Sequence, residues 1–250
     1  MKRFFSLVAF YARGSLPRIL IALAVLCAVQ AGVFLVRVDN VLQVYAQQGM
    51  REFIMLSPVH LLSIWAFLYI SWKLLRQGAS AVSERTMARL PVSRRMISLA
   101  QILYNLAVLF LFWAVLTALY YGLWNYYLSQ LPETYVSPQG FFYWSYVNPT
   151  LHGFLPMEDG PVWVRNFLWL MSLSVSLAAA SDCLRRGRNP LSTYLLLMFL
   201  LFTGVEAGIG STKRTIVGIV VPLFLMFIEM IRLVAFDREE KEDEGVEHHA

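Results

Sequence analysis

Long apolar runs separated by shorter polar segments make up most of this chain. Several runs approach the roughly 20 residues that an α-helix needs to cross about 30 Å of hydrocarbon. The runs show no alternation of polar and apolar residues, which the strands of a membrane barrel would require. We therefore predict an all-α, polytopic membrane protein of about six transmembrane helices. The predicted spans are about 18–36, 54–75, 97–122, 162–180, 191–209 and 215–236.

The two ends of the chain differ from the spans. Residues 2–16 are too few to cross a membrane, but Phe4, Val8 and Tyr11 share one helical face and basic residues flank them. This pattern predicts an N-terminal interfacial helix, and the alternative is the frayed start of the first span. At the other end, the acidic residues 237–250 predict a disordered cytoplasmic tail.

Composition and charge support this interpretation. The chain is 58% hydrophobic and 15% charged, whereas a soluble domain is usually about 25% charged. The net charge of +5 comes from basic residues that flank apolar runs, so we expect contact with membrane lipid and not with nucleic acid. With both termini on one side, only five basic residues fall on the other, and the chain is predicted to be multi-pass in the cell membrane with both termini cytoplasmic. Those five are Arg37, Arg51, Arg165, Lys213 and Arg214.

The segment between the second and third spans contains the string SERTMARLPVSRR. Its charges and apolar positions predict a short surface helix, which Pro91 then interrupts because proline clashes with the preceding turn. Ser93 is placed to cap the start of the next helix. A docking element for a cytoplasmic partner would have these features, and so would an ordinary basic loop that follows the positive-inside rule.

This string, with an apolar helix after it, resembles the cytoplasmic segment of type-2 ABC transporter permeases, the membrane-spanning subunits of ABC transporters. The length of the chain and its six predicted spans also resemble that family. The resemblance implies a cytoplasmic coupling helix at about 79–92 that docks on a P-loop ATPase subunit. It also implies a second copy or a paralogous permease subunit. The residues expected to face the ATPase are Glu84, Arg85, Arg89 and Leu90.

The chain has no G-x-x-x-x-G-K-[ST] motif, so ATP and Mg would be bound by the separate ATPase chain. The expected function is therefore that of a transport subunit and not of an enzyme. It would use alternating access to export an amphiphilic substrate, such as a peptide, a lipid or a drug. The alternative is a scaffold or immunity-type membrane protein that binds a peptide or another membrane protein without ATP.

An aromatic segment at 123–161 follows the third predicted span. Its rings include Trp124, Tyr127, Phe142 and Trp144. Tryptophan and tyrosine favour the membrane–water boundary, where the apolar ring and the polar tip are both satisfied. The segment is expected to lie on the outer leaflet, either as an aromatic belt or as a surface that faces the substrate.

Three positions in the last two predicted spans are candidates for a function. Glu206 would line a translocation path or would lie in interfacial water, because an acid inside a membrane needs a partner or water. Pro222 should kink the sixth span and is a candidate gating hinge. Glu229 lies three residues before Arg232, and a structural ion pair is favoured over a proton relay.

Metal and nucleophile chemistry find little support in the sequence. His60 and His152 have no second ligand at a metal-binding spacing, and Cys27 and Cys183 do not form a disulfide framework. No metal site is therefore predicted. An intramembrane enzyme that uses Glu206 and a histidine would need two polar groups to converge in the membrane, and the sequence shows no such pair.

Overall fold

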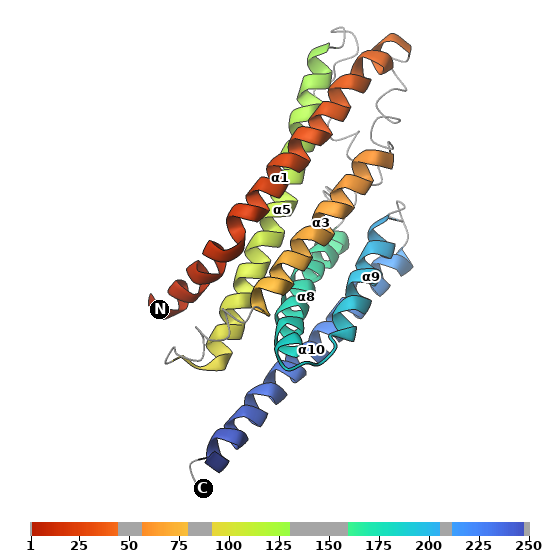
Figure 1. Cartoon of the computed structure of the whole chain (residues 1–250). Coiled ribbons are helices and arrows are strands. Elements are labelled where there is room, and N and C mark those ends of the chain that lie inside the picture. The colour runs from red at the N-terminus through yellow and green to blue at the C-terminus, as the bar shows by residue number, and fades with distance from the viewer. Residues whose placement is uncertain (1, 45–56, 80–91, 131–159, 206–211, 248–250) are drawn as a thin grey trace.

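The computed structural model describes residues 2–44, 57–79, 92–130, 160–205 and 212–247. These residues form six α-helices and no strand (Figure 1). The fold of the described residues is therefore all-α, as predicted. The helices are α1 (Lys2–Val44), α3 (Ser57–Gly78), α5 (Arg94–Gln130), α8 (Gly160–Arg185), α9 (Leu191–Val205) and α10 (Thr212–Glu247).

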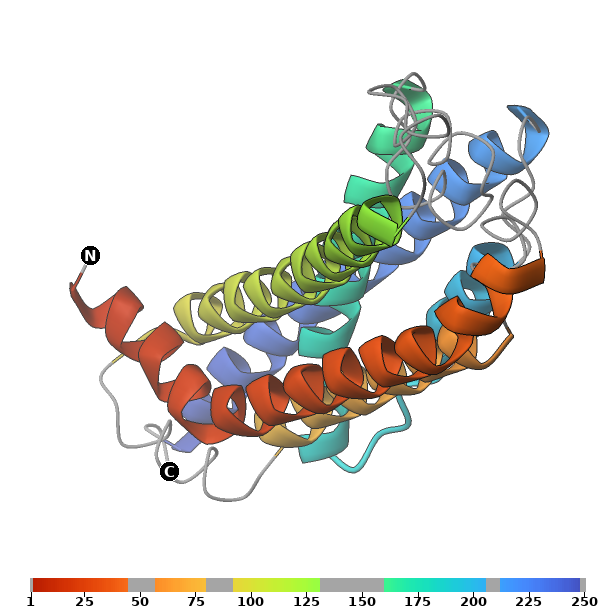
Figure 2. The same cartoon turned by 90° about the horizontal axis from the view of Figure 1, so that it is seen from above.

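The helices run side by side as an elongated bundle, with alternating directions along the chain (Figures 1 and 2). The start of α1 and the end of α10 lie at the same end of the bundle. We call this the terminal end, and the opposite one the far end. The ends of α3 and α8 and the starts of α5 and α9 also lie at the terminal end. This arrangement agrees with the expectation that both termini lie on one side of a membrane.

The first helix differs from the prediction of a separate interfacial helix. Residues 2–16 are helical, but α1 continues without interruption through Pro17. Figure 2 shows a change of direction in the first part of α1, and a proline inside a helix is a common cause of such a bend. The first part stays on the bundle because Leu7 and Tyr11 bury their side chains in the core.

Two other helices extend beyond their predicted ends. α5 continues to Gln130, so the first residues of the predicted external segment are helical. α10 continues to Glu247, through most of the acidic tail that was predicted to be disordered. The tail is rich in glutamate, which is a good helix former.

Helix α8 lies at the centre of the bundle. It packs against α3, α5, α9 and α10, and every residue from Ser172 to Cys183 is buried. Most of these twelve residues are serine or alanine, and small side chains let neighbouring helices approach closely inside a membrane. A helix that is enclosed on all sides does not need a one-sided apolar stripe.

The outside of the bundle is apolar. Large side chains such as Ile21, Phe167, Val220 and Phe227 are exposed, which water would disfavour and lipid would not. Four helices among the described residues are long and apolar enough to cross a membrane, and α9 contains a shorter apolar stretch. The structure is therefore that of a helical membrane protein. The four candidate spans are Arg3–Val36, Arg94–Gln130, Gly160–Arg185 and Thr215–Ala235.

Candidate functional site

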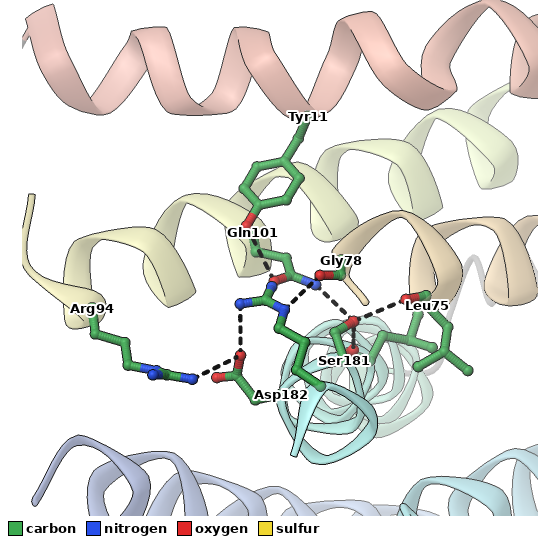
Figure 3. Close-up of polar contacts among 9 residues, drawn as sticks. Tyr11, Leu75, Gly78, Arg94, Gln101, Ser181 and Asp182 are labelled. Carbon is green, nitrogen blue, oxygen red and sulfur yellow. Dashed lines mark hydrogen bonds and ion pairs between the residues drawn. The ribbon is translucent and has the colours of Figure 1, made fainter. Parts of the chain in front are cut away.

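A buried ion-pair group lies at the terminal end of α8 (Figure 3). Oδ1 of Asp182 is 3.1 Å from Nη1 of Arg185, one turn further along the same helix. The same oxygen is 3.8 Å from Nη2 of Arg94, at the start of α5. The side chains of Asp182 and Arg185 are only 6% and 8% exposed, and a carboxylate at such a position needs cationic partners. Asp182 therefore joins the end of α8 to the start of α5.

A chain of neutral hydrogen bonds continues from this group to α1. Nε2 of Gln101 donates to Oγ of Ser181 at 2.9 Å. The hydroxyl of Tyr11 donates to Oε1 of Gln101 at 3.3 Å, so the amide of Gln101 bridges α1 and α8 (Figure 3). The hydroxyl of Ser15, one turn after Tyr11, is hydrogen-bonded to the hydroxyl of Tyr104 on α5. All these side chains are buried, where an unsatisfied polar group would be costly.

The end of α3 packs directly on the same group. Nε of Arg185 donates to the carbonyl oxygen of Gly78 at 2.7 Å. Oγ of Ser181 lies 3.2 Å from the carbonyl oxygen of Leu75. A Cβ atom on Gly78 would overlap the Gln101 amide and the Ser181 hydroxyl. Glycine at this position therefore allows α3 to end against α8. The last carbonyl groups of α3 accept hydrogen bonds from side chains of α8. We call Tyr11, Gly78, Arg94, Gln101, Ser181, Asp182 and Arg185 the four-helix cluster.

Local sequence features fix the helix ends that carry this cluster. Gly187 follows α8 with a φ of 67°, and the Arg188 amide donates to the carbonyl of Cys183 at 2.9 Å. These features form a Schellman cap, which favours glycine at the left-handed position. α5 begins directly after Ser93, whose carbonyl accepts from the Met96 amide at 3.0 Å. The predicted start of this helix is therefore confirmed.

A second polar group lies on the other side of the α8 end. Nη1 of Arg232 is 3.3 Å from Oε2 of Glu229, which confirms the predicted ion pair on α10. The hydroxyl of Ser192 on α9 donates to Glu229 and accepts from Nη1 of Arg232, the latter at 2.9 Å. Arg232 also lies 3.9 Å from Sγ of Cys183, the residue after Asp182. Residues at the end of α8 thus contact α3 and α5 on one side and α10 on the other.

Single polar contacts continue along the core toward the far end. Nδ2 of Asn105 donates to the carbonyl of Ser174 at 3.2 Å, and Nε2 of Gln30 donates to Oγ of Ser63 at 2.7 Å. Each contact joins two different helices. Buried hydrogen bonds of this kind hold membrane helices in register, because lipid offers no alternative partner.

The positions of charged residues on α8 indicate where the cluster lies relative to a membrane. Arg165, near the start of α8, stacks on the Trp169 ring at 4.7 Å, and Nε1 of Trp169 donates to the carbonyl of Gly218 at 2.7 Å. Twenty residues separate Arg165 from Arg185, which corresponds to about 30 Å of helix and matches the thickness of the hydrocarbon layer. In a bundle that crosses a membrane, this length would place the four-helix cluster near one boundary, where charged groups cost least.

The contacts of the cluster are those of a structural link between helices. The contacts of Ser181 are carbonyl oxygens and the amide of Gln101, and none of these groups acts as a base. Asp182 is held between two arginines. Among the described residues, no three of histidine, cysteine, aspartate and glutamate gather closely enough to hold a metal ion. What the cluster does is fix the ends of four helices to one another.

Most residues predicted from the sequence to form a site lie outside the described residues. This holds for the proposed ATPase-facing residues, for Glu206 and for the later part of the aromatic segment. The residues concerned are Glu84, Arg85, Arg89, Leu90, Phe142, Trp144 and Glu206.

The other predicted site residues are buried in the helix packing. Trp124 and Tyr127 lie on α5 and are only 7% and 3% exposed. α5 continues through them, and their rings are buried in the core. Pro222 lies inside α10 and is also buried.

The sequence prediction missed the four-helix cluster. Asp182 lies outside the predicted span 162–180, and the sequence analysis gave no role to Gln101 or Ser181. A glutamine inside an apolar span and an acid at the end of one both require partners in a membrane, which was the available indication. Their common location depends on the packing of four helices, which a single sequence does not show.

Comparison with protein-family models gives no match, and comparisons with curated proteins and with solved structures give none either.

Proposed function

We propose that the chain is the membrane-spanning subunit of an ATP-driven transporter of the type-2 ABC class. One observation supports this most directly: both ends of the proposed coupling segment contact the end of α8. Gly78, just before the segment, accepts a hydrogen bond from Arg185. Arg94, just after it, pairs with Asp182. A force on the segment between them would reach α8 from both sides.

The four-helix cluster gives such a force a physical route. A partner that binds the segment at 79–92 would displace the end of α3 and the start of α5. Arg185 and Asp182 would pass this displacement to α8, and Arg232, which contacts Cys183, would pass it to α10. ATP in the partner would then shift the equilibrium between two helix arrangements through their different contacts.

The remaining components of the transporter belong to the same proposal. The terminal end would face the cytoplasm, where a P-loop ATPase subunit holds ATP and Mg. A second copy, or a paralogous permease, would pack on an exposed apolar face and enclose the path. The proposed substrate is amphiphilic, because aromatic residues are frequent in the segment 123–161.

Co-purification from a mild detergent tests the proposal. The tagged full-length chain should bring along a protein that contains the P-loop motif, with ATPase activity in the sample. Arg89→Glu reverses one charge of the proposed docking surface and should abolish co-purification. Arg3→Glu is the matched control, because Arg3 is an exposed basic residue at the same end of the bundle. The control should retain the ATPase.

Two results would contradict the proposal. In the first, the intact chain purifies without any P-loop protein but with a peptide or another membrane protein, which would support the scaffold alternative. In the second, Arg89→Glu and Arg3→Glu lose the ATPase equally, which would show that general charge attraction, and not a defined segment, holds the partner.

A further inference from the structure

An exposed surface that combines cations and aromatic rings runs along α3 near the terminal end. Nζ of Lys73 lies 4.8 Å from the centre of the Trp72 ring and 5.4 Å from that of Tyr69. Cζ of Arg76 lies 5.1 Å from the Trp72 ring. Trp72 and Tyr69 are 45% and 38% exposed. One tryptophan therefore holds two cations on the outside of the bundle.

The neighbouring helix α1 adds a third cation at the same level. Gln77 of α3 contacts α1 at Gly14, where a Cβ atom would lie 2.7 Å from Nε2 of Gln77. Arg18 is four residues after Gly14, and Lys73 is four residues before Gln77. Because α1 and α3 run in opposite directions, both positions lie one turn further toward the far end, on the sides of the helices that meet. Arg18 is exposed.

These three cations have no acidic partner among the described residues. Asp182 and Glu229 pair with other residues, among them Arg94, Arg185 and Arg232. The sequence of α3 contains no aspartate or glutamate. Three cations that lie within about one helical turn of each other, without an acidic partner among the described residues, attract an anion.

Apolar side chains continue from the cations toward the far end. On α1, Ile21 and Val25 follow Arg18 on the same face and are 64% and 56% exposed. On α3, Trp65 lies two turns beyond Lys73 and is 68% exposed. The surface thus has a cationic part at the membrane boundary and an apolar part that extends toward the membrane centre. This is the order of the head group and acyl chains of a phospholipid.

We propose that this surface binds an anionic phospholipid. The phosphate lies against Arg18, Lys73 and Arg76, and the acyl chains lie along Ile21, Val25 and Trp65. Trp72 keeps Lys73 and Arg76 directed toward the head group, because both cations stack on its ring. We call the three cations together with Trp72 the lipid site. It depends on the membrane placement of the bundle and not on the proposed transport function.

Lipid binding to the purified full-length chain tests this site without any ATPase partner. The chain in detergent is titrated with phosphatidylglycerol or with phosphatidylcholine of the same acyl chains, and bound lipid is counted by native mass spectrometry. The intact chain should prefer phosphatidylglycerol. Glycerol 3-phosphate in excess should not displace the bound lipid, because it lacks the acyl chains that the apolar part of the site holds.

The double variant Arg18→Gln/Lys73→Gln should bind phosphatidylglycerol about 25-fold more weakly, since each basic residue near an anionic head group contributes a factor of about five. The matched control is Arg3→Gln/Arg95→Gln, which removes two exposed basic residues at the same end but outside the site. The control should bind within about twofold of the intact chain, on the same scale. If the double variant does not fold, Lys73→Gln alone should show about a fivefold loss.

Three results would overturn the assignment. The first is equal affinity for phosphatidylglycerol and phosphatidylcholine. The second is an equal loss in the double variant and in its control. The third is displacement of the lipid by glycerol 3-phosphate, which would show that the site binds a free phosphate compound and not a lipid. A failure to find an ATPase partner would leave all three readouts unchanged, so the two proposals fail independently.

Discussion

At the scale of single residues, the structure explains why glycine ends α3. Gly78 lies where the last turn of α3 meets the side chains of Gln101 and Ser181. These two side chains hydrogen-bond to each other and connect α5 with α8. Any side chain at position 78 would have to push this bonded pair apart. The close contact of α3 with Gln101 and Ser181 is therefore possible because Gly78 has no Cβ atom.

Gly78→Ala should destabilise the protein by about 1–3 kcal/mol, the usual cost of an extra group in a packed core. Thermal unfolding in a mild detergent, followed by tryptophan fluorescence, should show a lower midpoint. Gly32→Ala is the control, because a Cβ atom at Gly32 meets nothing within 4 Å. The control should unfold at the same temperature or slightly higher, since alanine favours a helix more than glycine does. Equal destabilisation of the two variants would mean that the close contact at Gly78 is not a constraint.

At the scale of secondary-structure elements, α8 connects the two sides of the bundle. Its last turn holds Asp182, which pairs toward α5, and Cys183, which contacts Arg232 of α10. Asp182 and Glu229 pair with arginines that differ in their exposure to solvent. Arg185 is 8% exposed, whereas Arg232 is 33% exposed. A lost partner should therefore matter more for Arg185.

Asp182→Asn should cost about 3 kcal/mol, because it leaves Arg185 buried without a charged partner. Glu229→Gln should cost about 1 kcal/mol, since Arg232 can turn toward water or lipid head groups. Both substitutions keep the shape of the side chain and remove one charge, so each serves as the control for the other. Thermal unfolding under identical conditions measures the order of the two. The reverse order would show that the Glu229 pair, and not the Asp182 pair, secures the end of α8.

At the scale of the whole molecule, the helices place both termini at one end of the bundle. The basic residues concentrate at the same end. The starts of α1 and α5 and the turn after α8 all carry arginines there. Toward the far end, the described helices carry Arg37, Arg165, Lys213 and Arg214. The positive-inside rule then predicts that the terminal end faces the cytoplasm.

Cysteine labelling in intact cells tests this orientation. In a background of Cys27→Ala and Cys183→Ala, single cysteines at Arg3, Arg95 and Arg188 should resist a membrane-impermeant maleimide until the cells are opened. Single cysteines at Gln130 and Pro161 should react at once, because these exposed positions lie at the far end. Labelling of all five positions in intact cells, or of the first three alone, would contradict the predicted topology.

The positions of the helices followed largely from the sequence. The predicted spans 97–122, 162–180 and 215–236 lie inside α5, α8 and α10, respectively. Hydrophobic length is a local property, so it can be recognised without knowing what a helix touches. The start of α5 after Ser93 was predicted for the same reason, since a cap involves adjacent residues.

The helix ends were harder to predict. The sequence predicted a separate interfacial helix at 2–16, but α1 continues through this region because Leu7 and Tyr11 bury their side chains against the bundle. It ended the third span at residue 122, but Trp124 and Tyr127 are in the core and α5 continues to Gln130. In each case, burial against another helix decided the end, and the local pattern did not.

The sequence by itself determined the helical class, the approximate positions of the helices and the ion pair of Glu229 with Arg232, because these depend on residues close together in the chain. Only the tertiary structure placed Tyr11, Gln101, Ser181 and Asp182 in one cluster. Those residues come from three helices, and up to 171 positions separate them. Their meeting depends on how each helix is rotated and on small residues that let α8 lie at the centre. The rotation of each helix and its depth in the bundle are set by the neighbouring helices, so the sequence of one helix does not determine them.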